Sequence, residues 1–398
     1  SHAEPWANPH VLPQVIRWLG HEDAPLLWRW RANPAQFMWG LRFLNECRPA
    51  QTRRNMAAIV ALALYSRGCL QALRRELALE YDHLERGILH LYTDPRAFAK
   101  AMDAARAMRE LGLDREPVSA ERCVEIEPAL AGARPRLAGG HFTPSDESGD
   151  AYKFTRALAK RAAAAGVEFR LDSTVDRITA SGGRITGVMV SDLAGQQLMT
   201  ADAYVVALGS YTPLLLRPLG VRLAVIPAKG YSATVPLSAA AVAPTVSLTD
   251  DEHRLVFSRL GNRLRIAGTA EFNGYDTAIN PVRCAALRLG ARARRQFAPE
   301  PRAGSVRPRA GCFSLSTQEL LALDGRALEP NFPLNFRRLP PPAAPAQSPR
   351  QWCHPRRCPM PAPCQTRETG FLPWPCRSSH RPGSGSTIRF WKLLPEYE

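Results

Sequence analysis

Prolines limit what this chain can fold into. The chain has 398 residues and 35 prolines, of which 16 lie in residues 1–280 and 19 in residues 281–398. Residues 331–382 alone contain 13 of them. Proline lacks a backbone N–H and clashes with the preceding helical turn, so this density excludes long helices and central strands. The sequence therefore predicts a folded part that ends near residue 300 and a disordered tail over residues 301–398.

The balance of charge changes at the same place. Residues 1–280 carry 33 Lys and Arg against 29 Asp and Glu, and residues 281–398 carry 19 against 7. The last segment therefore holds 12 of the 16 net positive charges, and 18 of its 19 basic residues are arginines scattered among prolines and serines. A solvated tail, or DNA translated in the wrong frame, explains this better than a nucleic-acid site, which gathers its charge on one face. We expect no nucleic-acid partner; binding of polyanions by the tail stays an alternative.

The cysteines predict neither a metal site nor a disulfide framework. The folded part contains four isolated cysteines, Cys47, Cys69, Cys123 and Cys284. Isolated cysteines of this kind are typical of reduced thiols in a cytoplasmic protein. The tail contains four more, Cys353, Cys358, Cys364 and Cys376. They are not spaced in the close pairs that ligate a structural zinc ion. We therefore expect no bound metal.

Membrane contact is expected to be peripheral. No signal peptide is visible, and the longest apolar run, Met56–Tyr65, is about half the length that spans a bilayer. Tryptophans and arginines alternate in residues 1–47, a pattern that suits either a membrane surface or packing into a domain. The expected location is the cytoplasm, with contact to the inner face of the plasma membrane.

Periodicity predicts helices first and then an α/β layer. Apolar residues recur at helical spacing over residues 53–79 and 95–112. Asp150 can cap a further helix that Gly166 would end. Strands are predicted over residues 167–171, 184–190 and 203–208, so that helix and strand alternate.

A second kind of sheet is predicted further along the chain. Residues 245–272 contain strand patterns separated by a turn at Gly261 and Asn262. Consecutive strands joined by a tight turn pair in the antiparallel sense. The expected fold class is therefore α/β plus α+β.

Several runs of sequence resemble a known family. The runs are EPWANP (4–9), YSRGCLQALRRE (65–76), GGHFTPSDESGDAYKFT (139–155), GVEF (166–169), ADAYVVALGSY (201–211), KGYS (229–232) and RIAGTAE (265–271). Together they resemble the small subunit of bacterial D-amino-acid dehydrogenases. That subunit belongs to the wider family of FAD-dependent D-amino-acid, glycine and sarcosine oxidoreductases. The resemblance covers about three quarters of the chain, from Ala3 to near Pro299.

The resemblance implies a flavoenzyme that deaminates D-amino acids to 2-oxo acids and ammonia. The implied cofactor is FAD, and the implied partners are the D-amino acid substrate and a respiratory-chain electron acceptor. In the family, the position of Val175 contacts the adenine, and those of Ala207 and Gly209 lie along the adenosine and pyrophosphate. Tyr231, in the loop that begins at Lys229, is implied to bind substrate; a packed strand tyrosine is the alternative. No catalytic residue is assigned.

Two family features are not recognisable in this sequence. The family begins with a strand, a glycine-rich loop and a helix that hold the pyrophosphate. Its C-terminal part carries a GLRP-like run with the carboxylate-binding arginine and a Gly-His-Gly turn. Residues 302–314 keep no recognisable part of that segment. We therefore expect a gene product truncated at its start and out of frame near residue 300, with poor solubility and weak or no flavin binding.

The expected domain organisation follows from the predicted helices and strands and from the family resemblance. We expect a partial Rossmann-like FAD-binding domain that lacks its first βαβ unit, an antiparallel-sheet substrate domain and a disordered C-terminal tail. The predicted regions are a largely helical substrate or cap region (1–140), the remaining FAD-binding part (141–212), the substrate-domain sheet (213–300) and the tail (301–398). The alternatives are a glycine- or sarcosine-oxidase-like flavoenzyme and an inactive remnant.

Overall fold

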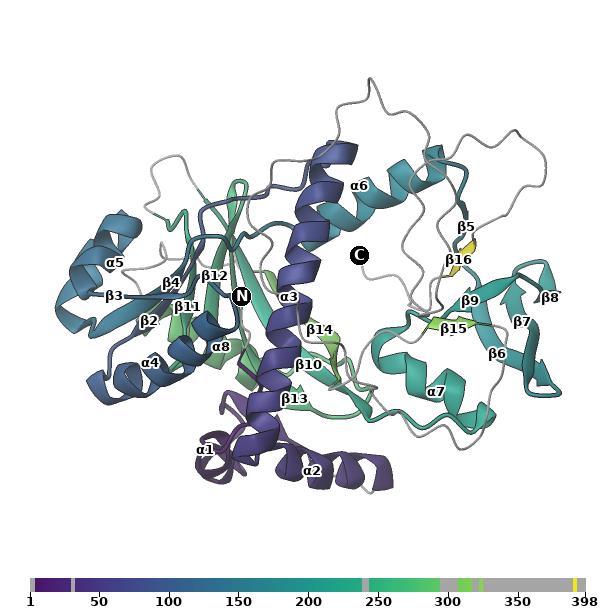
Figure 1. Cartoon of the computed structure of the whole chain (residues 1–398), viewed down its shortest axis with the longest axis horizontal. Helices are drawn as coiled ribbons and strands as arrows, with labels where there is room; N and C mark the ends of the chain where they lie inside the picture. The colour runs from purple at the N-terminus through teal and green to yellow at the C-terminus, as the bar shows by residue number, and fades with distance from the viewer. Residues whose placement is uncertain are drawn as a thin grey trace, which may run out of the picture.

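The computed structural model describes residues 4–29, 33–237, 243–293, 307–316, 322–324 and 389–391, and from residue 288 onward the backbone alone. A larger lobe is built on a nine-stranded sheet, and a smaller lobe is built on a three-stranded sheet (Figure 1). The two sheets lie side by side in this view, and the long helix α3 (Pro49–Leu77) runs in front of the nine-stranded sheet.

The nine-stranded sheet is mixed. Its order is β14-β10-β13-β12-β11-β2-β4-β3, and β1 pairs with the end of β13. Most neighbours are antiparallel, as predicted, but β2–β11 and β1–β13 are parallel. The strands are β1 (Leu26–Trp28), β2 (Ile88–Tyr92), β3 (Glu116–Val118), β4 (Gly139–Thr143), β10 (Val225–Pro236), β11 (Ser247–Asp250), β12 (Leu255–Leu260), β13 (Arg263–Phe272) and β14 (Arg307–Ser316).

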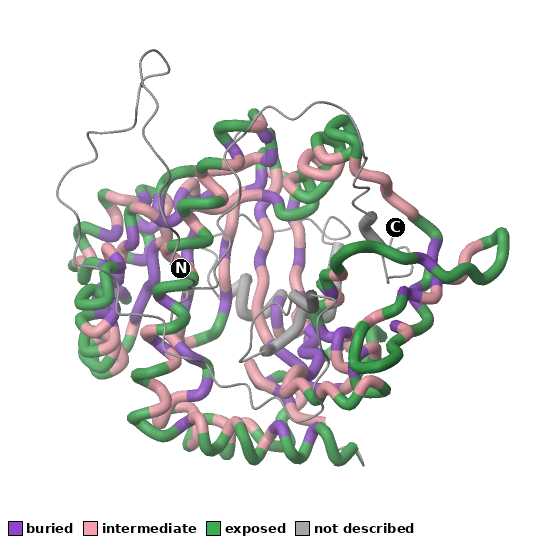
Figure 2. Tube along the Cα trace, turned by 45° about the vertical axis from the view of Figure 1, so that its right-hand side comes forward, coloured by how far each residue is buried: buried purple, intermediate pink, exposed green. Residues whose placement is uncertain are grey.

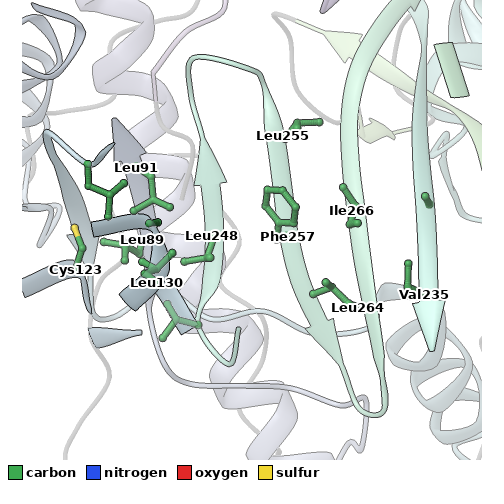
Figure 3. Packing of buried hydrophobic residues seen from close by; sticks show 14 of the residues in the cluster. Leu89, Leu91, Cys123, Leu130, Val235, Leu248, Leu255, Phe257, Leu264 and Ile266 are labelled. Carbon is green, nitrogen blue, oxygen red and sulfur yellow. The ribbon is translucent and has the colours of Figure 1, made fainter. Parts of the chain in front are cut away.

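One face of this sheet carries the main hydrophobic core. Alternate residues of neighbouring strands point to this face, among them Leu89, Leu248, Phe257 and Ile266 (Figure 3). The core is closed by the short helix α5 (Ala120–Ile126), the 3₁₀ helix η1 (Pro128–Arg136) and α8 (Pro281–Ala293). Because the core draws on residues 1–140 and 213–293, the regions treated as separate in the sequence share one core.

The opposite face is covered by the other helices of this lobe. They are α1 (Val11–Trp18), α2 (Pro34–Glu46), α3 and α4 (Pro95–Glu110). Helices α3 and α4 pack together through Met56, Val60 and Met108. Within the described residues α3 is the one helix long and apolar enough to cross a membrane by length and composition, with 11% of its most apolar stretch buried.

Proline and glycine positions explain where these helices begin and end. Pro34, Pro49 and Pro95 occupy the first turn of α2, α3 and α4, where a missing N–H costs nothing. The helix predicted over 53–79 therefore begins four residues earlier, at Pro49, and ends at Leu77. The helix predicted over 95–112 begins at Pro95, as expected, and ends at Glu110. Ser119 caps α5 by accepting a hydrogen bond from the Arg122 N–H.

The smaller lobe contains the predicted α/β segment. Its elements are α6 (Ala151–Ala164), β5 (Glu168–Arg170), β6 (Thr174–Ser181), β7 (Arg184–Asp192), β8 (Gly195–Met199), β9 (Ala203–Val205), η2 (Gly209–Tyr211), α7 (Thr212–Leu216) and η3 (Arg217–Leu219). Strands β6, β7 and β8 form an antiparallel sheet. Its small core includes Val175, Val190 and Leu216, and long exposed stretches surround it (Figure 2).

Three strands fall within the segment expected to be disordered. β14 pairs antiparallel with β10, β15 (Ala322–Asp324) with β9, and β16 (Arg389–Trp391) runs parallel to β5. Pro308 is tolerated in β14 because this strand lies at the end of the sheet. The rest of residues 301–398, and the four tail cysteines, lie outside the described residues.

Candidate functional site

A cavity of about 1160 Å³ lies between the second face of the nine-stranded sheet and helices α1 and α2. We call the sheet side its floor and the α1–α2 side its roof. The floor residues come from β2, β10, β11, β12 and β13. A pocket of this size takes a molecule at least as large as a typical bound metabolite, since such pockets are roughly 300–1,000 Å³.

Strand alternation places polar side chains on the floor. On β13, Leu264 and Ile266 enter the core, whereas Arg265 and Ala267 line the cavity. Likewise Leu89 of β2 is in the core, and its neighbour His90 lines the cavity. The same period that builds the core therefore builds a polar floor.

A β-bulge changes this alternation at Thr269. Gly230 pairs with Ala270 and Tyr231 with Gly268, so Thr269 is the extra residue on β13. Its φ is +61°, which is rare and costly for a β-branched residue. Its Oγ1 is buried at the cavity without a hydrogen-bond partner among the described residues.

Arg265 is the second floor residue with an unused donor. Its Nε is buried, and no described residue accepts a hydrogen bond from it. A buried donor without an acceptor is destabilising, by about 1–3 kcal/mol. Arg265 and Thr269 therefore mark a part of the floor that a ligand with acceptor atoms would stabilise.

At the β2 side of the cavity, buried ionisable groups cluster around Asp251. Its Oδ2 lies 2.8 Å from His90 Nδ1 and accepts a hydrogen bond of 2.8 Å from the Tyr92 hydroxyl. Burial lowers the pKa of His90 and raises the pKa of Tyr92. Burial also raises the pKa of Glu4, and the nearby Asp251 charge adds to this rise. Neutral His90 and Tyr92 are therefore favoured at neutral pH.

Tyr231, predicted to bind substrate, takes part in a buried charge network. Its hydroxyl donates a 2.6 Å hydrogen bond to Glu271, and Arg29 Nε donates one of 3.1 Å to the same carboxylate. Lys229 Nζ lies 3.4 Å from Glu271. Burial raises the pKa of Glu271, but the hydrogen bonds from Tyr231 and Arg29 outweigh this, and its pKa is lowered overall. Tyr231 contributes to the cavity wall, and its substrate contact stays a prediction.

The residues predicted to bind the nucleotide lie together in the smaller lobe. The Val175 side chain is buried in one cluster with Val206, which brings β6 to the chain segment after β9. Ala207 and Gly209 are exposed there, and Gly209 has a φ of +54°. An exposed backbone with a glycine in the left-handed region allows a nucleotide to approach closely. Their contacts with a cofactor stay predictions.

The sequence reasoning missed Arg265, Thr269 and Glu271 as site residues. All three stand in the RIAGTAE run, where charged residues interrupt a strand pattern. A buried charge inside a strand is rare unless it is paired or binds something, so that interruption was the available signal.

The class of protein follows from comparison with known families. Residues 25–336 match the DAO family of FAD-dependent oxidoreductases, and the chain belongs to this family. The family is FAD-dependent, and the smaller-lobe residues above fit one wall of a nucleotide site. The described residues contain no glycine-rich loop that would hold the phosphates.

Two relatives make the comparison more specific. The chain is 70% identical over 288 residues to a D-amino acid dehydrogenase of Dechloromonas aromatica strain RCB, covering 72% of this chain and 69% of that protein. It is 54% identical over 283 residues to the D-amino acid dehydrogenase of Paramagnetospirillum magneticum, covering 71% and 66%. The matches thus span about two thirds of the length of these relatives.

Solved structures show the same fold. Glycine oxidase from Geobacillus kaustophilus superposes with a TM-score of 0.54 at 24% identity, covering 64% of this chain and 67% of that one. L-proline dehydrogenase from P. horikoshii superposes with a TM-score of 0.53 at 15% identity, covering 62% and 65%. At these identities the likeness concerns the fold alone.

Proposed function

We propose that this chain acts in the FAD-dependent oxidative deamination of D-amino acids to 2-oxo acids and ammonia. The observation that carries the proposal is the 70% identity over 288 residues to a D-amino acid dehydrogenase. The structural likeness to glycine oxidase, at 24% identity, supports the fold and gives no preference for glycine as substrate.

The chemistry divides between the cofactor and the chain. When bound, FAD supplies a two-electron acceptor for the hydrogen on the substrate α-carbon. The amino acid loses two electrons and two protons, and water hydrolyses the resulting imino acid to the 2-oxo acid and ammonia. The floor of the cavity would orient the substrate. Val175, Ala207 and Gly209 would contact the adenosine part of the cofactor.

The proposal is tested by flavin binding and then by flavin reduction. The purified chain is titrated with FAD, and the loaded protein is mixed anaerobically with D-alanine, L-alanine, glycine or sarcosine. Bleaching of the flavin band by D-alanine alone supports the proposal. Bleaching by glycine or sarcosine alone overturns it in favour of the oxidase-like alternative, and no flavin binding at saturating FAD supports the inactive remnant.

We propose further that the electron acceptor is a respiratory one and that the chain works at the cytoplasmic face of the plasma membrane. This is supported by large apolar side chains exposed on α1 and α2: Ile16, Phe37, Met38, Leu41 and Leu44. Arginines accompany them, which suits anionic lipid. Flotation with anionic vesicles tests the location, and reoxidation by a quinone analogue rather than oxygen tests the acceptor.

A further inference from the structure

We propose that Tyr275 positions the nucleotide-binding turn of the smaller lobe, Gly209–Tyr211. In this proposal one tyrosine of the larger lobe holds the backbone against which the adenosine part of the cofactor lies. The inference rests on the proposed function, in which Ala207 and Gly209 contact that part of FAD. It adds to the proposed function the residue that fixes their conformation.

The turn has little local support of its own. It forms the three-residue 3₁₀ helix η2, and Leu208 before it has no side-chain atom that could cap the helix. Ala207 and Gly209 are exposed, and Gly209 has a φ of +54°. Glycine loses more conformational freedom on folding than any other residue, so this turn is costly to order. Contacts from outside the segment are therefore needed to keep it in one conformation.

Tyr275 supplies two such contacts. Its hydroxyl donates a 2.8 Å hydrogen bond to the Ser210 carbonyl. Its ring centroid lies 5.2 Å from that of Tyr211, with the two ring planes 38° apart. The first contact fixes a peptide group of the turn and the second fixes the next side chain, so together they set its position and its orientation. Ser210 is buried and Gly209 is exposed, so these contacts do not cover the glycine.

The loop that carries Tyr275 is itself fixed to the larger lobe. After the end of β13, Asn273 Nδ2 donates a 2.8 Å hydrogen bond to Asp276 Oδ2. The Ala278 N–H donates one of 2.9 Å to Asp276 Oδ1. Lys229 Nζ, which is buried, donates one of 2.8 Å to the Ala278 carbonyl. Tyr275 therefore lies in a short loop that is fastened on both sides of it.

The same loop connects the turn to the cavity. Lys229 Nζ also lies 3.4 Å from Glu271, whose carboxylate accepts the hydrogen bond from the Tyr231 hydroxyl. Tyr231 contributes to the cavity wall. A continuous series of contacts thus runs from the cavity wall through Lys229 and Tyr275 to the nucleotide-binding turn. Such a connection would hold the cofactor at a fixed distance from the cavity, as catalysis by proximity requires.

The test compares tyrosine variants of the full chain. Tyr275→Phe removes the hydroxyl and keeps the ring, and Tyr275→Leu removes both. Tyr152→Phe is the matched control, because its hydroxyl accepts an exposed hydrogen bond from Arg156 on α6. Hydrogen exchange of residues 207–211 is measured without nucleotide, and the Kd values of FAD and ADP are measured by calorimetry. Thermal midpoints show which variants fold; if Tyr275→Leu does not, Tyr275→Phe alone decides.

We expect Tyr275→Phe to speed exchange in residues 207–211 and to raise the Kd values of FAD and ADP about threefold to tenfold. The reason is that one hydrogen bond contributes about that much to holding the binding conformation. Tyr275→Leu should raise both constants at least about tenfold, because the ring contact is lost as well. Tyr152→Phe should change neither the exchange nor the two constants.

Unchanged Kd values in the Tyr275 variants would overturn the inference, even with faster exchange, because a tyrosine that only stabilises the fold leaves the affinity of the folded chain unaltered. If D-alanine still bleaches the bound flavin in that case, the proposed function stands. Weaker nucleotide binding together with a flavin that D-alanine does not bleach supports the inference and counts against the proposed deamination. No binding of FAD or ADP by the unmodified chain overturns both.

Discussion

At the scale of single residues, two separate sequence runs meet at one carboxylate. The KGYS run supplies Lys229 and Tyr231, and the RIAGTAE run supplies Glu271, which is 1% exposed. Arg29 reaches the same carboxylate from the segment after β1. The network fixes the bulged end of β13 against β10, directly beside the cavity.

Replacing Glu271 by Gln should be strongly destabilising. The change removes the negative charge that Lys229 and Arg29 share, and breaking a buried ion pair costs about 3–5 kcal/mol. We expect a loss of about 3 kcal/mol in the free energy of unfolding, measured by urea denaturation. Glu121→Gln is the matched control, because its ion pair with Arg134 is exposed. A Glu271→Gln midpoint equal to that of Glu121→Gln would show that the network adds no stability.

The buried side chain of His141 should make the free energy of unfolding depend on pH. It is fully buried, neither ring nitrogen has a hydrogen-bond partner among the described residues, and burial lowers its pKa from 6.5 to about 4. The unfolded chain therefore binds this proton more tightly than the folded chain. The free energy of unfolding is undiminished above pH 6.5 and falls as the pH is lowered toward 4. The loss is on the order of 3 kcal/mol.

Urea midpoints measured between pH 7 and pH 4.5 check this, with His141→Phe as the comparison. The variant keeps an aromatic ring beside Tyr92 and Phe98 but cannot take up a proton. Its pH slope should be shallower than that of the unmodified chain. Parallel slopes would assign the acid sensitivity to other groups.

At the scale of elements, local sequence chemistry predicted the limits of helix α6 correctly, but it predicted strand β9 to be longer than it is. Capping at Asp150 and the left-handed Gly166 (φ +93°) bound α6 as predicted. The strand predicted over residues 203–208 is only Ala203–Val205, and Val205 is 65% exposed. An apolar run indicates a strand covered on both faces only if neighbouring strands are present. Among the described residues β15 alone pairs with β9.

Asp150 carries a testable share of the stability of α6. Its Oδ1 accepts hydrogen bonds from the Tyr152 and Lys153 N–H groups, and its Oδ2 accepts one of 2.8 Å from Arg263. Asp150→Ala should lower the free energy of unfolding by about 2 kcal/mol. Asp150→Asn keeps an oxygen for the cap and should recover about half of the loss. Thermal or urea unfolding distinguishes them; identical losses would place the whole effect in the Arg263 ion pair.

At the scale of the whole molecule, the sequence predicted the fold class but not how the segments combine. Local patterns identify strands, whereas the parallel pairing of β2 with β11 joins residues far apart in the chain. Likewise the cavity depends on α1 and α2 lying over β13, which no periodicity encodes. The charged residues in the RIAGTAE run were a sequence signal, but the structure was needed to show that the Arg265 Nε and the Thr269 hydroxyl have no hydrogen-bond partner among the described residues.

The two lobes should unfold at different free energies. The larger lobe has an extensive buried core, and the smaller lobe has a separate cluster around Val190. The lobes meet through several polar and ring contacts. The Tyr275 hydroxyl donates a 2.8 Å hydrogen bond to the Ser210 carbonyl, Arg263 donates one of 2.8 Å to Asp150, and the Phe154 ring packs edge-on against Tyr81. The two hydrophobic clusters are nevertheless separate, which allows one part to open without the other.

Hydrogen exchange resolved by mass spectrometry measures this directly. Amides of β12 and β13 should exchange at a higher free energy than those of β6 and β7. Leu248→Ala, in the large core, should lower protection there by about 2–5 kcal/mol and leave β6 and β7 unchanged. Val190→Ala should lower protection by ~2 kcal/mol in the smaller lobe alone. A single exchange free energy shared by both lobes, shifted equally by either variant, would show that the molecule unfolds as one unit.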